Sequence, residues 1–155
     1  MNIEPLTRAA FAPFGDVIEM SGTPLIINQG FADRFDDLCT VDMIDGGTVK
    51  VSLFAARQRP QPIKIDLMER HALGSQAFYP LMDQAWLVLV CDDPHDTNSF
   101  RCFRASGQQG VNYARGTWHF PLLVFAPSRF IVVDRKGPGK NLEEAMLAEP
   151  LSLLT

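Results

Sequence analysis

The sequence predicts an all-β fold of short strands, on two observations. Turn-forming residues recur at intervals of roughly eight to twelve, as in Phe14-Gly15-Asp16, Asp45-Gly46-Gly47 and Lys136-Gly137-Pro138, a spacing typical of sandwiches and barrels. The 11 glycines and 11 prolines leave little room for long helices. We therefore expect a barrel or sandwich with a few short helices.

The segments between the turns have strand character. Residues 49–54 alternate polar and apolar side chains, which predicts a strand with one buried face. Residues 86–91 are apolar throughout, as expected of a strand buried on both faces, and residues 122–126 and 130–134 are similar. Two short helices are predicted, one beginning near Thr7 and one after Asn141.

The composition predicts one globular domain over residues 1–155. Hydrophobic residues make up 46% of the chain, near the globular average, and we find no internal repeat or linker. The net charge of −4 and the scattered basic residues argue against a nucleic-acid-binding surface. A small anion held by one or two local arginines stays compatible with this charge.

Three cysteines without C-x-x-C spacing, Cys39, Cys91 and Cys102, predict buried reduced thiols rather than a disulfide framework or a zinc ribbon. The first residues lack the pattern of a secretory signal, and the longest apolar run, 85–91, is too short to span a bilayer. We expect a cytoplasmic protein without membrane contact.

Two stretches, residues 69–80 and 110–121, carry the chemistry. Glu69 and His71 are two positions apart, so on a strand both side chains face the same side. Gln76 follows on the next predicted strand, and His119 follows the tight turn at Gly116. If the barrel closes, these side chains converge and offer oxygen and imidazole ligands for a divalent metal such as Ni, Mn, Fe or Zn. Read from the residues alone, hydrogen-bonded core histidines and a solvated glutamate remain open alternatives.

The spacing resembles the two-part cupin motif, His-x-His-x4-Glu followed by Gly-x-x-His. Here it reads Glu69-x-His71-x4-Gln76 and Gly116-x-x-His119, with two ligands replaced. The residues between and around these positions, together with 12–18, 27–30 and 133–135, resemble the bacterial ureidoglycolate lyases over nearly the whole chain.

The resemblance implies a cupin-type jelly-roll barrel, a homodimer and a role in purine-derived nitrogen recovery. It implies an enzyme that cleaves the carbon–nitrogen bond of ureidoglycolate to give glyoxylate and urea. The cofactor it implies is a divalent metal, nickel first, with no organic cofactor. The metal ligands would be Glu69, His71, Gln76 and His119.

On this reading His119 or His71 carries out the proton transfers, and Glu69 is the partner acid or base if burial raises its pKa. Arg34 is the candidate for binding the substrate carboxylate. The other candidates for substrate binding, each with a core or surface role as its alternative, are Asn28, Gln76, Tyr113, Trp118 and Tyr79.

Other functions compete with this prediction. Another cupin enzyme, a metal dioxygenase or a sugar-nucleotide epimerase, would use the same barrel, although a dioxygenase usually needs more histidines than His71 and His119. A non-catalytic module that binds glyoxylate, or a purely structural β domain, is the remaining alternative.

Overall fold

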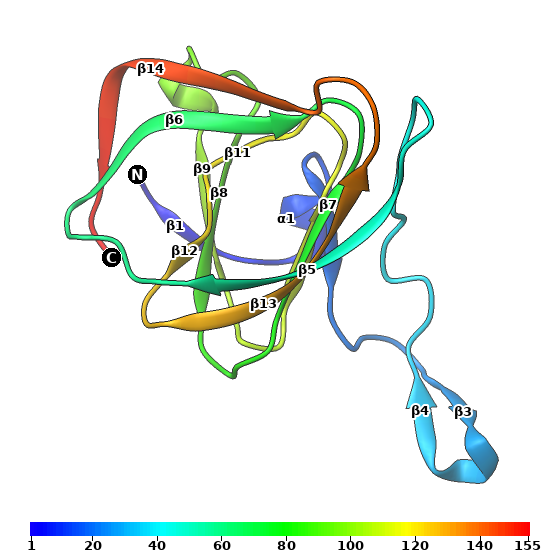
Figure 1. The fold of residues 1–155 in the computed structure, drawn as a ribbon. Coiled ribbons are helices and arrows are strands. Elements are labelled where there is room, and N and C mark those ends of the chain that lie inside the picture. Colours follow the sequence, from blue (N-terminus) through cyan, green and yellow to red (C-terminus); the bar gives the residue numbers. More distant parts are fainter.

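The computed structural model describes residues 1–155 and consists of two facing β-sheets with a projecting hairpin (Figure 1). The seven-stranded sheet contains β1 (Ile3–Pro5), β9 (Arg101–Ala105), β8 (Trp86–Cys91), β11 (Trp118–His119), β6 (Ile63–His71) and β14 (Leu142–Leu153), in that order, with β12 (Leu123–Val124) paired to β8. The five-stranded sheet runs β2 (Gly15–Ile18), β10 (Gly110–Tyr113), β7 (Gln76–Pro80), β13 (Ser128–Lys136), β5 (Thr48–Ala56).

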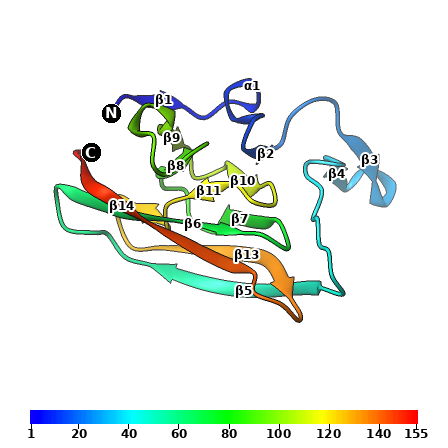
Figure 2. The same cartoon turned by 90° about the horizontal axis from the view of Figure 1, so that it is seen from above.

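Successive strands cross between these two sheets. The chain passes from β5 to β6, back to β7, and on to β8 and β9, before β10 returns to the five-stranded sheet. Nearly all pairings are antiparallel, and the view from above shows the two layers enclosing a common interior (Figure 2). The predicted all-β fold is confirmed, as two facing sheets.

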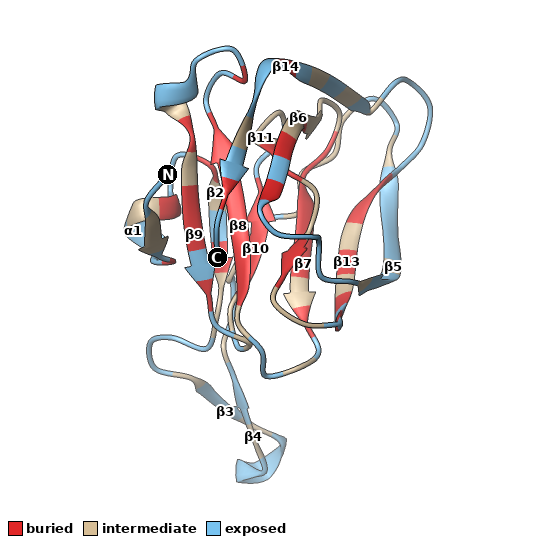
Figure 3. Ribbon diagram, turned by 90° about the vertical axis from the view of Figure 1, so that its left-hand side faces the viewer, coloured by how far each residue is buried: buried red, intermediate tan, exposed pale blue.

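The interior between the sheets is filled by aromatic and branched side chains. Strand β8 is buried along its whole length, as the apolar run predicts. Its alternate residues divide between two clusters: Trp86, Val88 and Val90 join the core between the sheets, while Leu87 and Leu89 pack in a second core on the other face. Buried segments therefore concentrate in the central strands, as Figure 3 shows.

The first predicted helix is confirmed as α1 (Arg8–Phe11), whose N-cap Thr7 accepts a hydrogen bond from the Ala10 amide. Two single-turn 3-10 helices, η1 (Asn28–Gly30) and η2 (Thr97–Ser99), complete the helical content. None of these helices has the length and apolar character that crossing a membrane requires.

The second predicted helix is wrong, because residues 142–153 form the long strand β14. This segment pairs in antiparallel register with β6, so its backbone groups are satisfied by the neighbouring strand. Asn141 does not cap a helix; its side chain accepts a hydrogen bond from the Leu73 amide and its carbonyl accepts one from Ala72.

Strand β5 forms where predicted, but the buried face is not the expected one. Val49, Val51 and Leu53 are exposed on the outer surface, and Phe54 packs inward against Phe78 with ring centroids 5.9 Å apart. Since β5 is the last strand of its sheet, its outer apolar residues have no neighbouring strand on one side. This chain by itself leaves that apolar surface uncovered.

A short hairpin of β3 (Leu25–Ile27), η1 and β4 (Ala32–Arg34) forms its own two-stranded sheet. It projects away from the barrel at the lower right of Figure 1. Its side chains Ile26 and Phe31 are exposed, the latter to 89%.

Candidate active site

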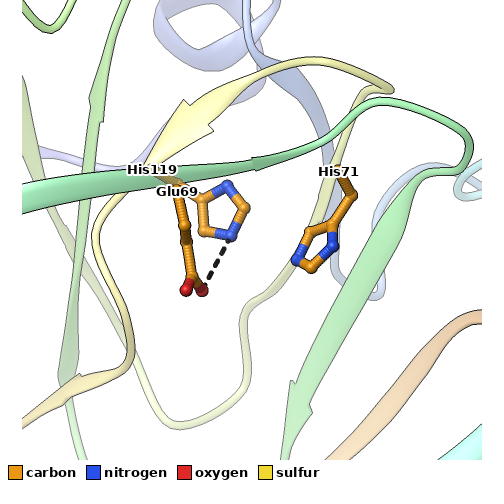
Figure 4. Close-up of side chains that lie close together, drawn as sticks. All are labelled: Glu69, His71 and His119. Atoms are coloured by element: carbon orange, nitrogen blue, oxygen red, sulfur yellow. Dashed lines mark ion pairs between the residues drawn. The ribbon is translucent and has the colours of Figure 1, made fainter. Parts of the chain in front are cut away.

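Strand pairing brings the predicted site residues together between the two sheets. On the seven-stranded side, His119 of β11 lies directly opposite Glu69 of β6 in the antiparallel register. On the five-stranded side, Tyr113 of β10 lies opposite Gln76 of β7. Glu69 and His71 share a face of β6, so both point inward as their spacing predicts (Figure 4).

The turn before His119 is fixed by a glycine. The Thr117 amide donates to the Ala114 carbonyl at 3.1 Å, and Gly116 at the third position of this turn has φ +83°. A positive φ at this position is the mark of a type II turn, which favours glycine. The Gly116 amide also donates to the His71 carbonyl at 2.9 Å, so the turn ties His119 to the end of β6.

The ring of His119 is held from two sides. Its Nδ1 lies 2.9 Å from the Thr117 carbonyl, which accepts a hydrogen bond from the protonated nitrogen. The ring stacks on Tyr113 at 4.1 Å between centroids and 9° between planes. Nε2 is therefore the nitrogen with a free lone pair, and it lies 3.5 Å from Glu69 Oε1 (the dashed line in Figure 4).

Three buried polar atoms around this point have no hydrogen-bond partner: His71 Nε2, His119 Nε2 and Gln76 Oε1. The His71 and His119 rings lie 5.5 Å apart. One ligand atom from each of Glu69, His71 and His119 can be chosen so that all lie within 4.8 Å of one another. Buried polar atoms normally find partners, so this cluster is suited to a bound ion or a polar ligand.

The neighbouring charges favour an ionised Glu69. Burial opposes the ionisation of Glu69, but the polar contact with His119 at 3.5 Å, the positive charges that His119 and His71 carry when protonated, and the charge of Arg59 outweigh it, so the pKa of this carboxyl is lowered. The condition for Glu69 as partner acid or base, a pKa raised by burial, is therefore not met.

Burial, followed by the charge of His119, lowers the pKa of His71, against the opposing influence of Glu69, Asp134 and Gln76. A neutral imidazole is the form that binds a metal or accepts a proton. Burial raises the pKa of Tyr113 and keeps that phenol protonated. The group thus places an ionised carboxylate beside the neutral imidazole of His71.

A cavity of about 400 Å³ opens beside these groups, between β5 and β6. Glu69 and Gln76 line its inner end, and Phe54 and Phe78 form part of its wall. Its lining also includes two arginines, Arg57 and Arg59, on the connection between β5 and β6. The sequence gives neither arginine a role, because the prolines of Arg59-Pro60-Gln61-Pro62 predict only a turn.

Four predicted residues lie away from this cavity. Arg34 and Asn28 belong to the projecting hairpin, where Arg34 is exposed and bonded to Asp36 at 2.8 Å. Trp118 points to the face opposite His119, beneath the Arg70 guanidinium at 4.5 Å from its ring centroid. Tyr79 follows the inward-facing Phe78 and so lies on the outer face of β7, beside Gly110. Within one chain these four do not contact the site.

The comparisons with known proteins give the family. A sequence profile of the family described as ureidoglycolate lyase matches residues 1–154. The chain belongs to the ureidoglycolate lyase family.

Individual relatives agree along most of their length. A protein named ureidoglycolate lyase from Burkholderia mallei is 52% identical, over 99% of this chain and 92% of that protein. Ureidoglycolate lyase 1 of Rhizobium meliloti is 51% identical, over 93% and 87% respectively. Ureidoglycolate lyase of Rhodobacter capsulatus is 48% identical, over 97% and 96%. The predicted family and enzyme class, a lyase, are confirmed.

Among solved structures, one of Bacillus subtilis oxalate decarboxylase, described with Mn(II) centres, covers 68% of this chain and 29% of that one, with 11% identity and a TM-score of 0.38. A likeness this slight carries no argument about the site.

The glycine turn generates the first prediction. Gly116→Ala forces an L side chain into a left-handed conformation and is expected to lower the free energy of unfolding by about 1–2 kcal/mol. No atom lies near the added methyl, so conformational strain rather than a clash is the cause.

Gly116→Asn is the control, because asparagine tolerates positive φ better than alanine. Urea unfolding of both variants tests the point. Equal stability of the alanine variant and the parent would contradict the role assigned to this turn.

Proposed function

We propose that this member of the ureidoglycolate lyase family cleaves ureidoglycolate into glyoxylate and urea at the cavity beside Glu69, His71 and His119. The observation that carries the proposal is the set of unpartnered buried lone pairs on the two imidazoles next to an ionised carboxylate. The family and the names of the relatives support the same substrate. The pathway served would be allantoin degradation.

The reaction needs a proton moved from oxygen to nitrogen. Ureidoglycolate carries a hydroxyl, a carboxylate and a ureido nitrogen on one carbon. When the hydroxyl loses its proton, its electron pair forms the carbonyl of glyoxylate and the carbon–nitrogen bond breaks. The departing nitrogen takes up one proton and leaves as urea, so no outside reactant is consumed.

We assign the proton acceptor to His119 Nε2. Its other nitrogen donates to the Thr117 carbonyl, which fixes the tautomer that leaves Nε2 free. The Glu69 carboxylate at 3.5 Å stabilises the imidazolium once formed. The same imidazolium then returns the proton to the departing nitrogen. Gln76 Oε1, buried and without a partner, accepts a hydrogen bond from the ureido group.

The same cluster fits a divalent metal. Glu69, His71 and His119 would hold it, since one ligand atom from each lies within 4.8 Å of the others. Gln76, whose buried Oε1 has no partner, would be a weaker fourth ligand. A metal bound there would lower the pKa of the substrate hydroxyl. Nickel is our first choice among the metals.

The chain, taken as one domain, is also proposed to form a homodimer. The support is the uncovered apolar surface of β5 and the exposed apolar residues of the hairpin, Ile26 and Phe31 among them.

The activity is tested with His119. His119→Ala and His119→Gln are expected to slow glyoxylate release at least about 100-fold, because the acceptor of the hydroxyl proton is lost. The control is His95→Ala, which removes an exposed histidine in a polar turn and should leave turnover unchanged. Circular dichroism verifies folding of each variant. Unchanged turnover in both His119 variants would contradict the assigned role.

The metal is tested by titrating chelator-treated protein with Ni²⁺ in a calorimeter. We expect one ion per chain, and a loss of that binding in Glu69→Gln and His71→Ala. Turnover that requires the ion would make His119 a ligand rather than the proton acceptor. Stoichiometric iron in protein purified without chelators would instead favour the dioxygenase alternative.

The oligomeric state is tested by sedimentation equilibrium, where we expect twice the chain mass of 17.3 kDa. Leu53→Asp places a charge on the exposed apolar surface of β5 and should shift the protein toward monomer. Lys64→Asp, on an exposed position of β6, is the control. A parent protein that sediments as a monomer would rule the dimer out.

A further inference from the structure

We propose that Arg59 binds the carboxylate of the substrate and makes the site selective for ureido acids over their uncharged analogues. The proposal rests on the proposed function and names the group that recognises its substrate. Arg59 thereby replaces Arg34 as the candidate for binding the carboxylate, because Arg34 lies on the projecting hairpin.

The first observation is where Arg59 lies. It lines the cavity together with Glu69 and Gln76, the residues at the inner end. Arg57 is the other cationic residue of that lining. A substrate bound beside Glu69 in this cavity therefore shares it with the Arg59 side chain.

The second observation is how Arg59 is held. Its guanidinium carbon lies 4.7 Å from the centroid of the Phe120 ring, in a cation–π contact. Phe120 is buried and immediately follows His119, and its amide donates to the Leu89 carbonyl. Stacking uses the face of the guanidinium and leaves its N–H edge free. That edge matches the two oxygens of a carboxylate.

The third observation is that Arg59 has no anionic partner in its own chain. Other arginines are already occupied by carboxylates: Arg8, Arg34, Arg70, Arg101 and Arg115. Arg135 donates to the backbone carbonyls of Ile44, Asp45 and Pro138. Neither Arg59 nor Arg57 makes an ion pair or a side-chain hydrogen bond, although both line a cavity next to the reactive groups.

Arg59 is favoured over Arg57 because only Arg59 is oriented by a stack on a buried ring. A long side chain loses rotamer entropy when it grips a ligand, and a stacked guanidinium has already lost part of it. Arg57 then adds charge to the mouth of the cavity without fixing the geometry.

The experiment compares two substrates that differ in the carboxylate. N-(hydroxymethyl)urea is ureidoglycolate without that group, and its cleavage gives formaldehyde and urea by the same movement of one proton. For Arg59→Gln we expect kcat/KM on ureidoglycolate to fall about 10- to 100-fold, chiefly through KM, because a charge-assisted contact is lost. On N-(hydroxymethyl)urea, followed as turnover or as competitive inhibition, the same variant should match the parent within about twofold.

Two further variants sharpen the test. Arg104→Gln is the matched control, because Arg104 is also exposed, also unpaired and also stacked on a phenylalanine, Phe125, at 4.8 Å, but lies outside the cavity. It should leave both substrates unaffected. Arg57→Gln should cost less than Arg59→Gln on ureidoglycolate.

An equal loss on both substrates in Arg59→Gln would mean a structural role and overturn the proposal, as would no loss on either. A larger loss in Arg57→Gln would overturn the choice of Arg59. Failure of the proposed function is visible separately, as a parent protein that releases no glyoxylate. In that case calorimetric binding of glyoxylate, weakened in Arg59→Gln and unchanged in Arg104→Gln, still decides whether Arg59 binds the carboxylate.

Discussion

The pairing of the two-residue strand β11 with β6 is the constraint on which the site depends. It places His119 opposite Glu69 across a single register position, while Gly116 ties the preceding turn to the His71 carbonyl. Without that register the imidazole of His119 would face the other side of the sheet, where Trp118 now lies against Arg70. One strand pair therefore decides whether these groups form a site.

The surrounding core buries Glu69, His71 and His119 at least in part and packs against them. Aromatic side chains from both sheets fill the interior, and Tyr113, itself in that core, stacks on His119. Burial discourages positive charge on His71, while the neighbouring cations keep Glu69 ionised. The three buried atoms without hydrogen-bond partners destabilise the folded chain. Such groups are typical of functional sites, where a bound ligand or ion supplies the missing contacts.

The cavity divides the work between two elements. Strands hold the groups to which we assign proton transfer or metal binding, and the β5–β6 connection carries Arg57 and Arg59, which line the same cavity. Rigid strands suit chemistry that tolerates little misplacement, whereas a connection can vary in sequence without disturbing the core. Substitutions in the β5–β6 connection would then change the selectivity for a substrate carboxylate without altering Glu69, His71 or His119.

The sequence by itself determined the all-β class, the strand at 86–91, the helix capped by Thr7 and the inward pair Glu69 and His71, because these follow from local periodicity and capping. It also determined the family, through motif residues spread along the chain. Only the tertiary structure decided what depends on pairing between distant strands. It made residues 142–153 a strand, left the apolar face of β5 outside, and moved the candidate carboxylate-binding arginine from Arg34 to Arg59. It also decided the direction of the Glu69 pKa shift: burial raises that pKa, but the contact with His119 and the neighbouring charges, known only in three dimensions, outweigh burial and lower it.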